Sequence, residues 1–237
     1  MRRGFSSARP VPGSALPHRP HAAPPKEPST DWARTSFVRA VRAVVQKTGL
    51  TPLVHSQVRL QVTGIEACLE ALEQGAVVVM NHASHLDTAA LLTALPASVR
   101  EHTAVAAAAD YFFDSWWRGT GTAIAFGTVP IERHGGHPSS TPGRLLEDGW
   151  TLVVFPEGTR SHDGWTAPFR VGAAHLALQA GVPIVPVAVR GSFVAMPRGR
   201  SWPAPGRPRV HLAFGQPLRA RADEAPRGLA ARCEQEV

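Results

Sequence analysis

The stretch AVVVMNHASHLD, residues 76–87, joins an uninterrupted apolar run to a polar turn. Five consecutive apolar residues that include three valines are typical of a strand buried on both faces, as in a parallel sheet. Polar residues follow at Asn81, so the strand ends there and a turn leads into the next helix. In open α/β sheets, ligands bind beyond the carboxyl ends of the strands. Residues 81–87 are therefore the first candidates for a functional site.

The chain around this stretch alternates short strands with helices. We expect strands over residues 58–63, 103–109, 126–131, 151–155, 182–189 and 209–214, and helices over residues 65–75, 85–95, 143–149 and 170–180. Alternation of this kind is typical of parallel strands covered by helices. We therefore predict an α/β fold with a single domain and a mixed, mostly parallel sheet flanked by helices.

Composition divides the chain into four segments. We expect a disordered, basic, proline-rich tail over residues 1–28, an amphipathic helix over 29–50, a folded domain over 51–222 and a C-terminal helix or tail over 223–237. Gly49 is expected to end the amphipathic helix. Its apolar arc, from Phe37 to Val45, is of a kind that can lie in a membrane interface. The sequence alone favours the alternative, in which this stripe packs on the domain.

The overall composition limits the expected partners. The 237 residues carry a formal net charge of +7, mostly from arginine, which suggests phosphate-bearing substrates, anionic lipid or nucleic acid. Two cysteines, Cys68 and Cys233, are too few for a disulfide framework. The N-terminal arginines precede no apolar run, and prolines interrupt residues 10–25, so we expect neither a secretory signal nor a transit peptide. The longest uncharged run, 171–189, is broken by a glycine and two prolines, so the chain is expected to be soluble or peripheral.

His82 and Asp87 are the candidate catalytic pair of the first motif. Positions five apart lie about 140° apart around a helix, so the two side chains can meet only if His82 lies in the turn and Asp87 in the first helical turn. A carboxylate on one imidazole nitrogen fixes the tautomer and leaves the other nitrogen as a base. The alternative is structural, because Ser84 and Asp87 also have the spacing of a capping box.

Two further motifs follow predicted strands. Residues 155–161 read FPEGTRS, where the proline ends the strand and Gly158 permits unusual backbone angles. This turn presents Arg160, which can clamp a phosphate, at the same sheet edge as His82 if the strands are parallel. Residues 127–133 read GTVPIER, and Arg133 is a second candidate phosphate ligand. By itself, Arg133 is better explained as an ordinary exposed arginine, and the Pro-Glu-Gly turn alone is weak evidence for a site.

Together the motifs resemble those of the glycerolipid acyltransferases, the 1-acylglycerol-3-phosphate acyltransferases and their relatives. The first block, Asn-His-x-x-x-x-Asp, is matched by Asn81, His82 and Asp87, and the third, Phe-Pro-Glu-Gly-Thr-Arg-Ser, at every position of 155–161. The second and fourth blocks are matched by Gly127, Ile131 and Arg133 and by Val182, Pro183 and Pro186. The four blocks occur in family order over roughly residues 55–220, a combination far more specific than any single motif.

The resemblance implies a glycerol-3-phosphate acyltransferase-like fold and an O-acyltransferase of phospholipid biosynthesis. Such an enzyme moves a fatty acyl group from acyl-CoA or acyl carrier protein to a lysophospholipid hydroxyl, with 1-acylglycerol-3-phosphate as the expected acceptor. His82 would act as general base and Asp87 would orient it. Substrate binding is expected at Asn81, Arg133, Glu157, Gly158, Thr159, Arg160 and Arg170. No metal and no cofactor beyond the acyl donor is expected, nor any nucleic-acid partner, and the protein should lie peripherally on the cytoplasmic face of an anionic membrane.

The sequence also departs from the family pattern. A segment that is often lysine-rich in relatives reads FRVGA over residues 169–173, with Arg170 in the basic position. Glu132 stands where relatives often have aspartate. Instead of the N-terminal membrane helices of many members, the sequence offers only the amphipathic segment. These departures concern how the protein meets the bilayer and which acceptor it prefers.

Two alternatives from other classes remain at this stage. A metal-dependent hydrolase could use His82, His85 and Asp87, although neither this spacing nor the later histidines form a familiar ligand pair. A non-enzymatic lipid- or nucleic-acid-binding module would explain the arginines of the C-terminal third, which lack aromatic stacking motifs or a zinc pattern.

Overall fold

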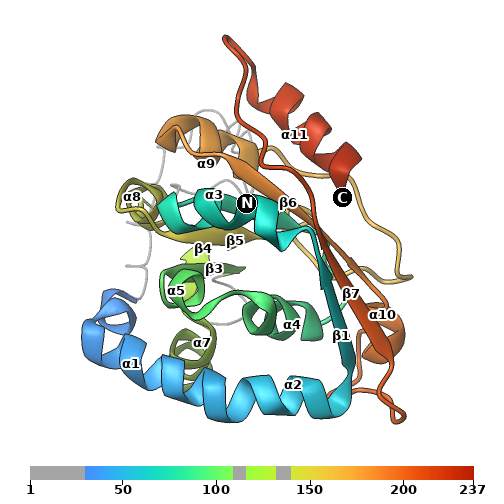
Figure 1. Cartoon of the computed structure of the whole chain (residues 1–237). Helices are drawn as coiled ribbons and strands as arrows, with labels where there is room; N and C mark the ends of the chain where they lie inside the picture. The colour runs from blue at the N-terminus through green and yellow to red at the C-terminus, as the bar shows by residue number, and fades with distance from the viewer. Residues whose placement is uncertain (1–29, 109–115, 132–139) are drawn as a thin grey trace, which may run out of the picture.

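The computed structural model describes residues 30–108, 116–131 and 140–237, and within them the strands form one sheet (Figure 1). The strand order is β1-β7-β6-β2-β5-β3-β4. Neighbouring strands run parallel, except that β6 and β7 are antiparallel. The predicted α/β class and the mixed, mostly parallel sheet are confirmed. The strand bounds are β1 Arg59–Thr63, β2 Val77–Met80, β3 Thr103–Ala108, β4 Thr128–Ile131, β5 Thr151–Val154, β6 Ile184–Arg190 and β7 Arg209–Phe214.

Helices cover both faces of the sheet because the central strands are apolar on both sides. In β2, Val78 and Met80 belong to one core cluster, while Val77 and Val79 belong to the other. Figure 1 shows α8, α9 and α11 along one side of the sheet and α4 and α5 along the other. The first group comprises α8 Thr141–Glu147, α9 Gly172–Ala180 and α11 Pro226–Glu236, and the second side holds α2 Thr51–Gln57, α3 Leu69–Gln74, α4 Leu86–Ala94 and α5 Ala97–Glu101.

Most predicted elements are present, and the differences fall where short-range patterns are weak. The C-terminal segment, predicted as helix or tail, contains α11. Among the described residues, α2, α5 and α7 Trp116–Phe126 were not predicted, and Phe126 ends α7 instead of beginning a strand. Short helical turns also occur as η2 Asp31–Arg34, η4 Ile65–Cys68 and α10 Ser192–Ala195. The predicted tail over residues 1–28 lies outside the described residues.

The amphipathic segment is longer than predicted. Helix α1 Ser36–Val45 continues through the π-helical turn η3 Gln46–Leu50 into α2. Gly49 does not end the helix, so that prediction was wrong. Its missing Cβ is not required here, because nothing lies within 4 Å of where one would stand. Tertiary contacts on either side of this glycine outweigh its weak preference for ending a helix.

The prediction that the apolar stripe of this segment packs on the domain was also wrong. Phe37 is 78% exposed and Val44 61% exposed, whereas Arg42 on the opposite face is only 2% exposed. The Arg42 guanidinium donates to the carbonyl oxygens of Ala123 and Ile124, at 2.9 and 3.0 Å. Those carbonyls belong to the last turn of α7, where helix acceptors lack intrahelical partners and the dipole favours a cation. The polar face of α1 therefore turns inward, and its apolar face is left outside.

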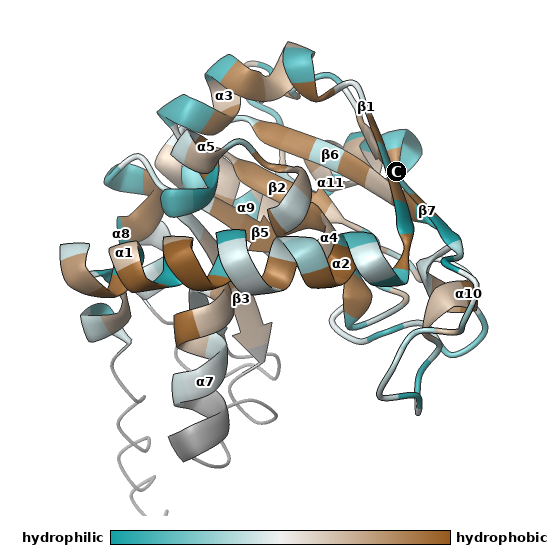
Figure 2. Cartoon of the chain, turned by 60° about the horizontal axis from the view of Figure 1, so that its bottom comes forward, coloured by the Kyte–Doolittle hydropathy of each residue, from teal (hydrophilic) through white to brown (hydrophobic). Residues whose placement is uncertain are grey.

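The outward apolar face extends from α1 into α2. Figure 2 shows both helices lying across the front of the view with hydrophobic residues recurring along them. We define the outer face of α1–α2 by its exposed apolar side chains: Phe37, Val41, Val44, Val45 and Leu53. Within the described ranges, no helix combines the length and apolar character needed to cross a bilayer.

Candidate active site

The turn between β2 and α4 brings His82 and Asp87 together. Nδ1 of His82 lies 2.9 Å from Oδ2 of Asp87, and the aspartate side chain is fully buried. The same oxygen accepts the backbone N–H groups of Ala83 and Ser84, at 2.8 and 2.7 Å. Asp87 therefore organises the start of α4 and also contacts the imidazole, an arrangement that is compatible with both interpretations of the motif.

The His82 ring is fixed on two sides. Phe155, the residue after β5, stacks on the imidazole with ring centroids 4.0 Å apart and planes inclined by 25°. The contact with Asp87 assigns the proton to Nδ1, which leaves Nε2 as the basic nitrogen. The His82 side chain is 16% exposed, so the ring is held in place without being sealed from a substrate. The sequence did not single out Phe155, although it opens the FPEGTRS motif.

Glu157 clamps the first motif to the turn that follows β5. Its Oε1 accepts the backbone N–H of His82 at 2.6 Å, and its Oε2 accepts that of Ala167 at 2.8 Å. The backbone N–H of Ser161 in turn donates to the carbonyl of His82 at 2.7 Å. Glu157 is 5% exposed, and burial raises the pKa of its carboxyl, although the two backbone donors oppose this shift. Both carboxyl oxygens are thus occupied by backbone groups.

Two polar side chains tie the first motif to β6 and its following helix. The Asn81 amide accepts the N–H of Val189 at 2.7 Å and donates to its carbonyl at 3.1 Å, which extends the β2–β6 ladder by a side chain. The hydroxyl of buried Ser84 donates to the carbonyl of Met196 at 2.7 Å. These contacts assign Asn81 to positioning the turn.

Cationic side chains lie beside the same turn. The guanidinium of Arg170 packs so closely over Gly158 that a Cβ there would stand 3.0 Å from Cζ. Gly158 has a φ of 74°. Both this backbone angle and the close approach of Arg170 therefore require glycine at this position. Arg160 is near enough for its positive charge to repel a proton on His85. Thr159 is exposed, and Arg133 lies outside the described residues, two positions beyond the end of β4.

The surroundings of His85 disfavour its charged form. Desolvation by surrounding atoms, followed by repulsion from Arg160 and His82, lowers the pKa of His85 to about 4, although its outer side is exposed. A histidine with this pKa is neutral at physiological pH and is a weak base. Within the part of the chain that the structure describes, no group of three or more His, Cys, Asp or Glu residues is placed to hold a metal ion.

Comparisons with known proteins agree with this geometry. A sequence profile of the acyltransferase family matches residues 59–190, which include β1 to β6 and the motifs at residues 81–87 and 155–161. The chain belongs to the acyltransferase family. Similar curated proteins are the sheep and mouse proteins named 1-acyl-sn-glycerol-3-phosphate acyltransferase alpha. The sheep protein is 36% identical over 118 residues, which are 47% of this chain and 38% of the sheep protein. The mouse protein is 32% identical over 145 residues, which are 57% of this chain and 48% of the mouse protein.

A solved structure shares the fold. The crystal structure titled 1-acyl-sn-glycerophosphate (LPA) acyltransferase, PlsC, from Thermotoga maritima has a TM-score of 0.62 and 24% sequence identity. It covers 87% of this chain and 79% of its own. The family profile confirms the resemblance of the motifs, and this structure shows the shared fold. The acyltransferase chain spans between about a sixth and a half of the length of the curated relatives it matches.

Proposed function

We propose that this acyltransferase moves a fatty acyl group from a thioester donor, acyl-CoA or acyl carrier protein, to a lysophospholipid hydroxyl, with 1-acylglycerol-3-phosphate as the acceptor. The observation that carries the proposal is the 2.9 Å contact between His82 and Asp87 in a strand-to-helix turn. Support also comes from the names of the similar sheep and mouse proteins, which specify this acceptor.

The proposed reaction is a direct transfer between two bound substrates. Nε2 of His82 takes the proton of the acceptor hydroxyl as its oxygen attacks the thioester carbonyl carbon. Asp87 stabilises the imidazolium through Nδ1. The C–S bond then breaks, and the departing thiolate takes the proton from His82, so the imidazole is regenerated. The sequence contains no Gly-x-Ser-x-Gly elbow that would present a serine nucleophile.

The acceptor phosphate is proposed to bind the arginines beside this turn. Arg160 and Arg170 are the described candidates, and Arg133 is added from the family pattern. Arginine suits this role because its planar guanidinium can bind a phosphate with two hydrogen bonds. Gly158 lets the Arg170 guanidinium approach the backbone. Glu157 acts here by holding the His82 backbone, since its oxygens already accept two N–H groups.

The protein is proposed to act as a peripheral protein at the cytoplasmic face of a membrane. The outer face of α1–α2 supports this location, because five exposed apolar side chains follow one continuous helical stretch. Large exposed apolar patches mark interaction sites, and a helix of this kind can bury its apolar face at the boundary between lipid headgroups and acyl chains. The acceptor is itself an amphiphile that resides in membranes.

A labelled-donor assay against a panel of lysophospholipids tests the proposal. The His82→Ala variant should lose about 10²–10⁴-fold in turnover, the usual contribution of a general base. His175→Ala is the matched control, because His175 is exposed on α9. A folded His82→Ala variant with near-normal turnover would rule out His82 as the base, and no transfer to any lysophospholipid by the native chain would refute the acceptor class.

A further inference from the structure

The loop that connects α10 to β7 is strongly cationic. We call residues 197–208 the arginine loop, because Arg198, Arg200 and Arg207 are all exposed within it. Arg209 follows at the start of β7 and is also exposed. No acidic residue occurs in the sequence between Asp163 and Asp223. No acidic residue of the same segment therefore neutralises the positive charge of this surface.

The arginine loop also exposes a large aromatic side chain. Trp202 is 55% exposed, between arginines on either side in the sequence. Tryptophan combines an apolar ring with one N–H donor, which suits the boundary between lipid headgroups and acyl chains. Arginine side chains beside it are suited to lipid phosphates.

This loop contacts the C-terminal end of α2, the helix that carries Leu53 of the outer face of α1–α2. The Arg207 guanidinium donates to the carbonyl of His55 in α2 at 2.6 Å, and the backbone N–H of Arg59, just after α2, donates to the carbonyl of Pro208 at 3.0 Å. Figure 1 shows the chain between α10 and β7 next to the end of α2. An apolar surface and a cationic loop thus adjoin at one side of the molecule.

The arginine loop is also connected to the active-site turn. It begins directly after Met196, whose carbonyl accepts the hydroxyl of Ser84 at 2.7 Å. Within it, the N–H of Ala204 donates to the carbonyl of Ala195 at 2.7 Å. The loop therefore follows the same short helix that supports the His82 motif, and a surface bound by the loop would lie close to the site.

We propose that the arginine loop and the outer face of α1–α2 form one docking surface for an anionic phospholipid bilayer. The apolar side chains enter the interface, and Arg198, Arg200 and Trp202 contact the headgroups. Charge complementarity favours this partner, because the loop is cationic and adjoins an apolar face. An anionic bilayer matches both features, whereas a soluble acidic protein matches only the charge. The inference rests on the proposed peripheral location, but it does not depend on the proposed reaction.

The test is co-sedimentation of the full chain with vesicles of two compositions. One set contains phosphatidylcholine alone, and the other contains three parts phosphatidylcholine to one part phosphatidylglycerol. The Arg198→Gln/Arg200→Gln variant should bind the anionic vesicles about 25-fold more weakly, since each arginine near such a surface contributes about fivefold. Its binding to the uncharged vesicles should not change. Raising the salt should weaken binding of the native chain to the anionic vesicles only.

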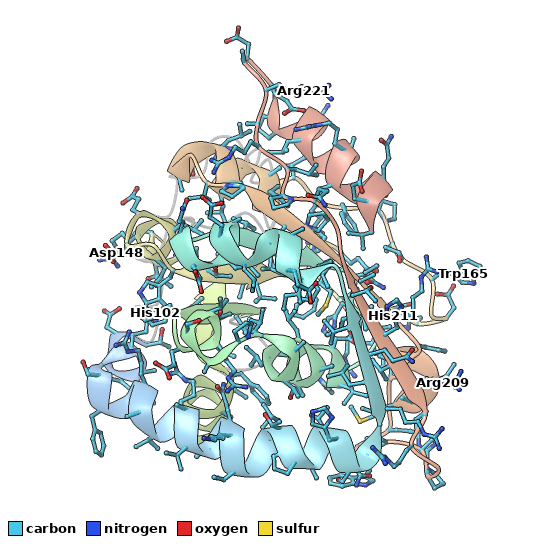
Figure 3. All side chains as sticks on the ribbon, in the orientation of Figure 1. His102, Asp148, Trp165, Arg209, His211 and Arg221 are labelled. Carbon is cyan, nitrogen blue, oxygen red and sulfur yellow. The ribbon has the colours of Figure 1, made fainter. Side chains whose placement is uncertain are left out.

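The control variant removes the same charge elsewhere. Arg221 and Arg227 are exposed near α11, and Figure 3 shows Arg221 at the opposite end of the molecule from Arg209. Arg221→Gln/Arg227→Gln should bind anionic vesicles within about twofold of the native chain, because salt screens surface charges that do not face the membrane. Equal losses in both variants would show a net-charge effect and overturn the proposal.

Two further outcomes also decide against it. Unchanged binding of the loop variant to anionic vesicles would exclude the arginine loop from the docking surface. If the loop variant binds vesicles normally but turns over more slowly with an acyl carrier protein donor, the arginine loop binds an acidic protein instead of the membrane. Normal vesicle binding without acyl transfer in the native chain would instead contradict the proposed function and leave the docking surface intact.

Discussion

The substitution Glu157→Gln tests whether Glu157 holds the backbone of His82 in place or binds the substrate. The carboxylate accepts the N–H groups of His82 and Ala167 at 2.6 and 2.8 Å, and the side chain is 5% exposed. A glutamine keeps one acceptor oxygen, but it points an NH₂ group at the other N–H. The loss of a charge-assisted hydrogen bond should cost about 1.5–3 kcal/mol. For a chain of this size, this corresponds to a fall in Tm of roughly 3–12 °C.

The assay combines thermal unfolding with steady-state kinetics. If Glu157 is a clamp, Glu157→Gln should lower both Tm and kcat, because the His82 backbone loses its anchor, while the KM for the acceptor changes little. Glu147→Gln, at an exposed site on α8, is the matched control and should leave both quantities nearly unchanged. An unaltered Tm together with a raised acceptor KM would refute the clamp and make Glu157 a substrate ligand.

The same carboxyl predicts a pH effect on stability. Burial raises the pKa of Glu157 in the folded state above its ordinary value of 4.5. The folded state then binds its proton more tightly than the unfolded state does, so this group's contribution to stability falls as the pH rises from 4.5 through the raised pKa. Glu157→Gln should lack this part of the pH dependence in denaturant unfolding. If the free energies of unfolding of the native chain and the variant change with pH in parallel, Glu157 does not contribute the expected pH dependence.

Three other substitutions test the dyad, the inverted helix and the outer face. Asp87→Asn should lower kcat by about 10²–10⁴-fold, because the imidazole loses the carboxylate that orients it, and a loss under tenfold in steady-state assays would contradict this role. Arg42→Met should destabilise the fold by about 3–5 kcal/mol in urea unfolding, since it leaves α7 carbonyls unpaired, whereas exposed Lys47→Met should stay within about 0.5 kcal/mol; similar values would argue against the contact with α7. Phe37→Ser/Val44→Ser should weaken vesicle binding at least tenfold without loss of stability, because both side chains are already exposed, and a fall in Tm would show that they pack on the protein.

The buried arginine of α1 shows why the sequence predicted the orientation of this helix incorrectly. Periodicity identifies which residues share a face, but it does not say which face meets the protein. Usually the apolar face turns inward, because burial of apolar surface is favourable. Here the last carbonyls of α7 supply acceptors for Arg42 and Gln46, at 2.9 and 2.8 Å. Burial also lowers the pKa of Arg42 to about 10, with further contributions from Arg34 and Arg39.

Local sequence was sufficient to predict the central strand β2 and the contact between His82 and Asp87. The apolar run before Asn81 predicted a doubly buried strand, and the spacing from His82 to Asp87 required one residue in the turn and one in the helix. Both follow from contacts only a few residues apart. The strand ends also predicted that the turn after β5 would lie beside this motif, because parallel strands place their carboxyl ends at one edge.

Only the tertiary structure decided what each neighbouring residue does. It assigned Glu157 to the backbone of His82 rather than to solvent, placed Phe155 on the imidazole, and joined Asn81 and Ser84 to the segment around β6. It also turned the apolar face of α1 outward and set the arginine loop beside α2. These outcomes depend on partners 70 or more residues away in the chain. Sequence patterns record the chemistry and period of a segment, whereas its partners are chosen only when the whole chain is packed.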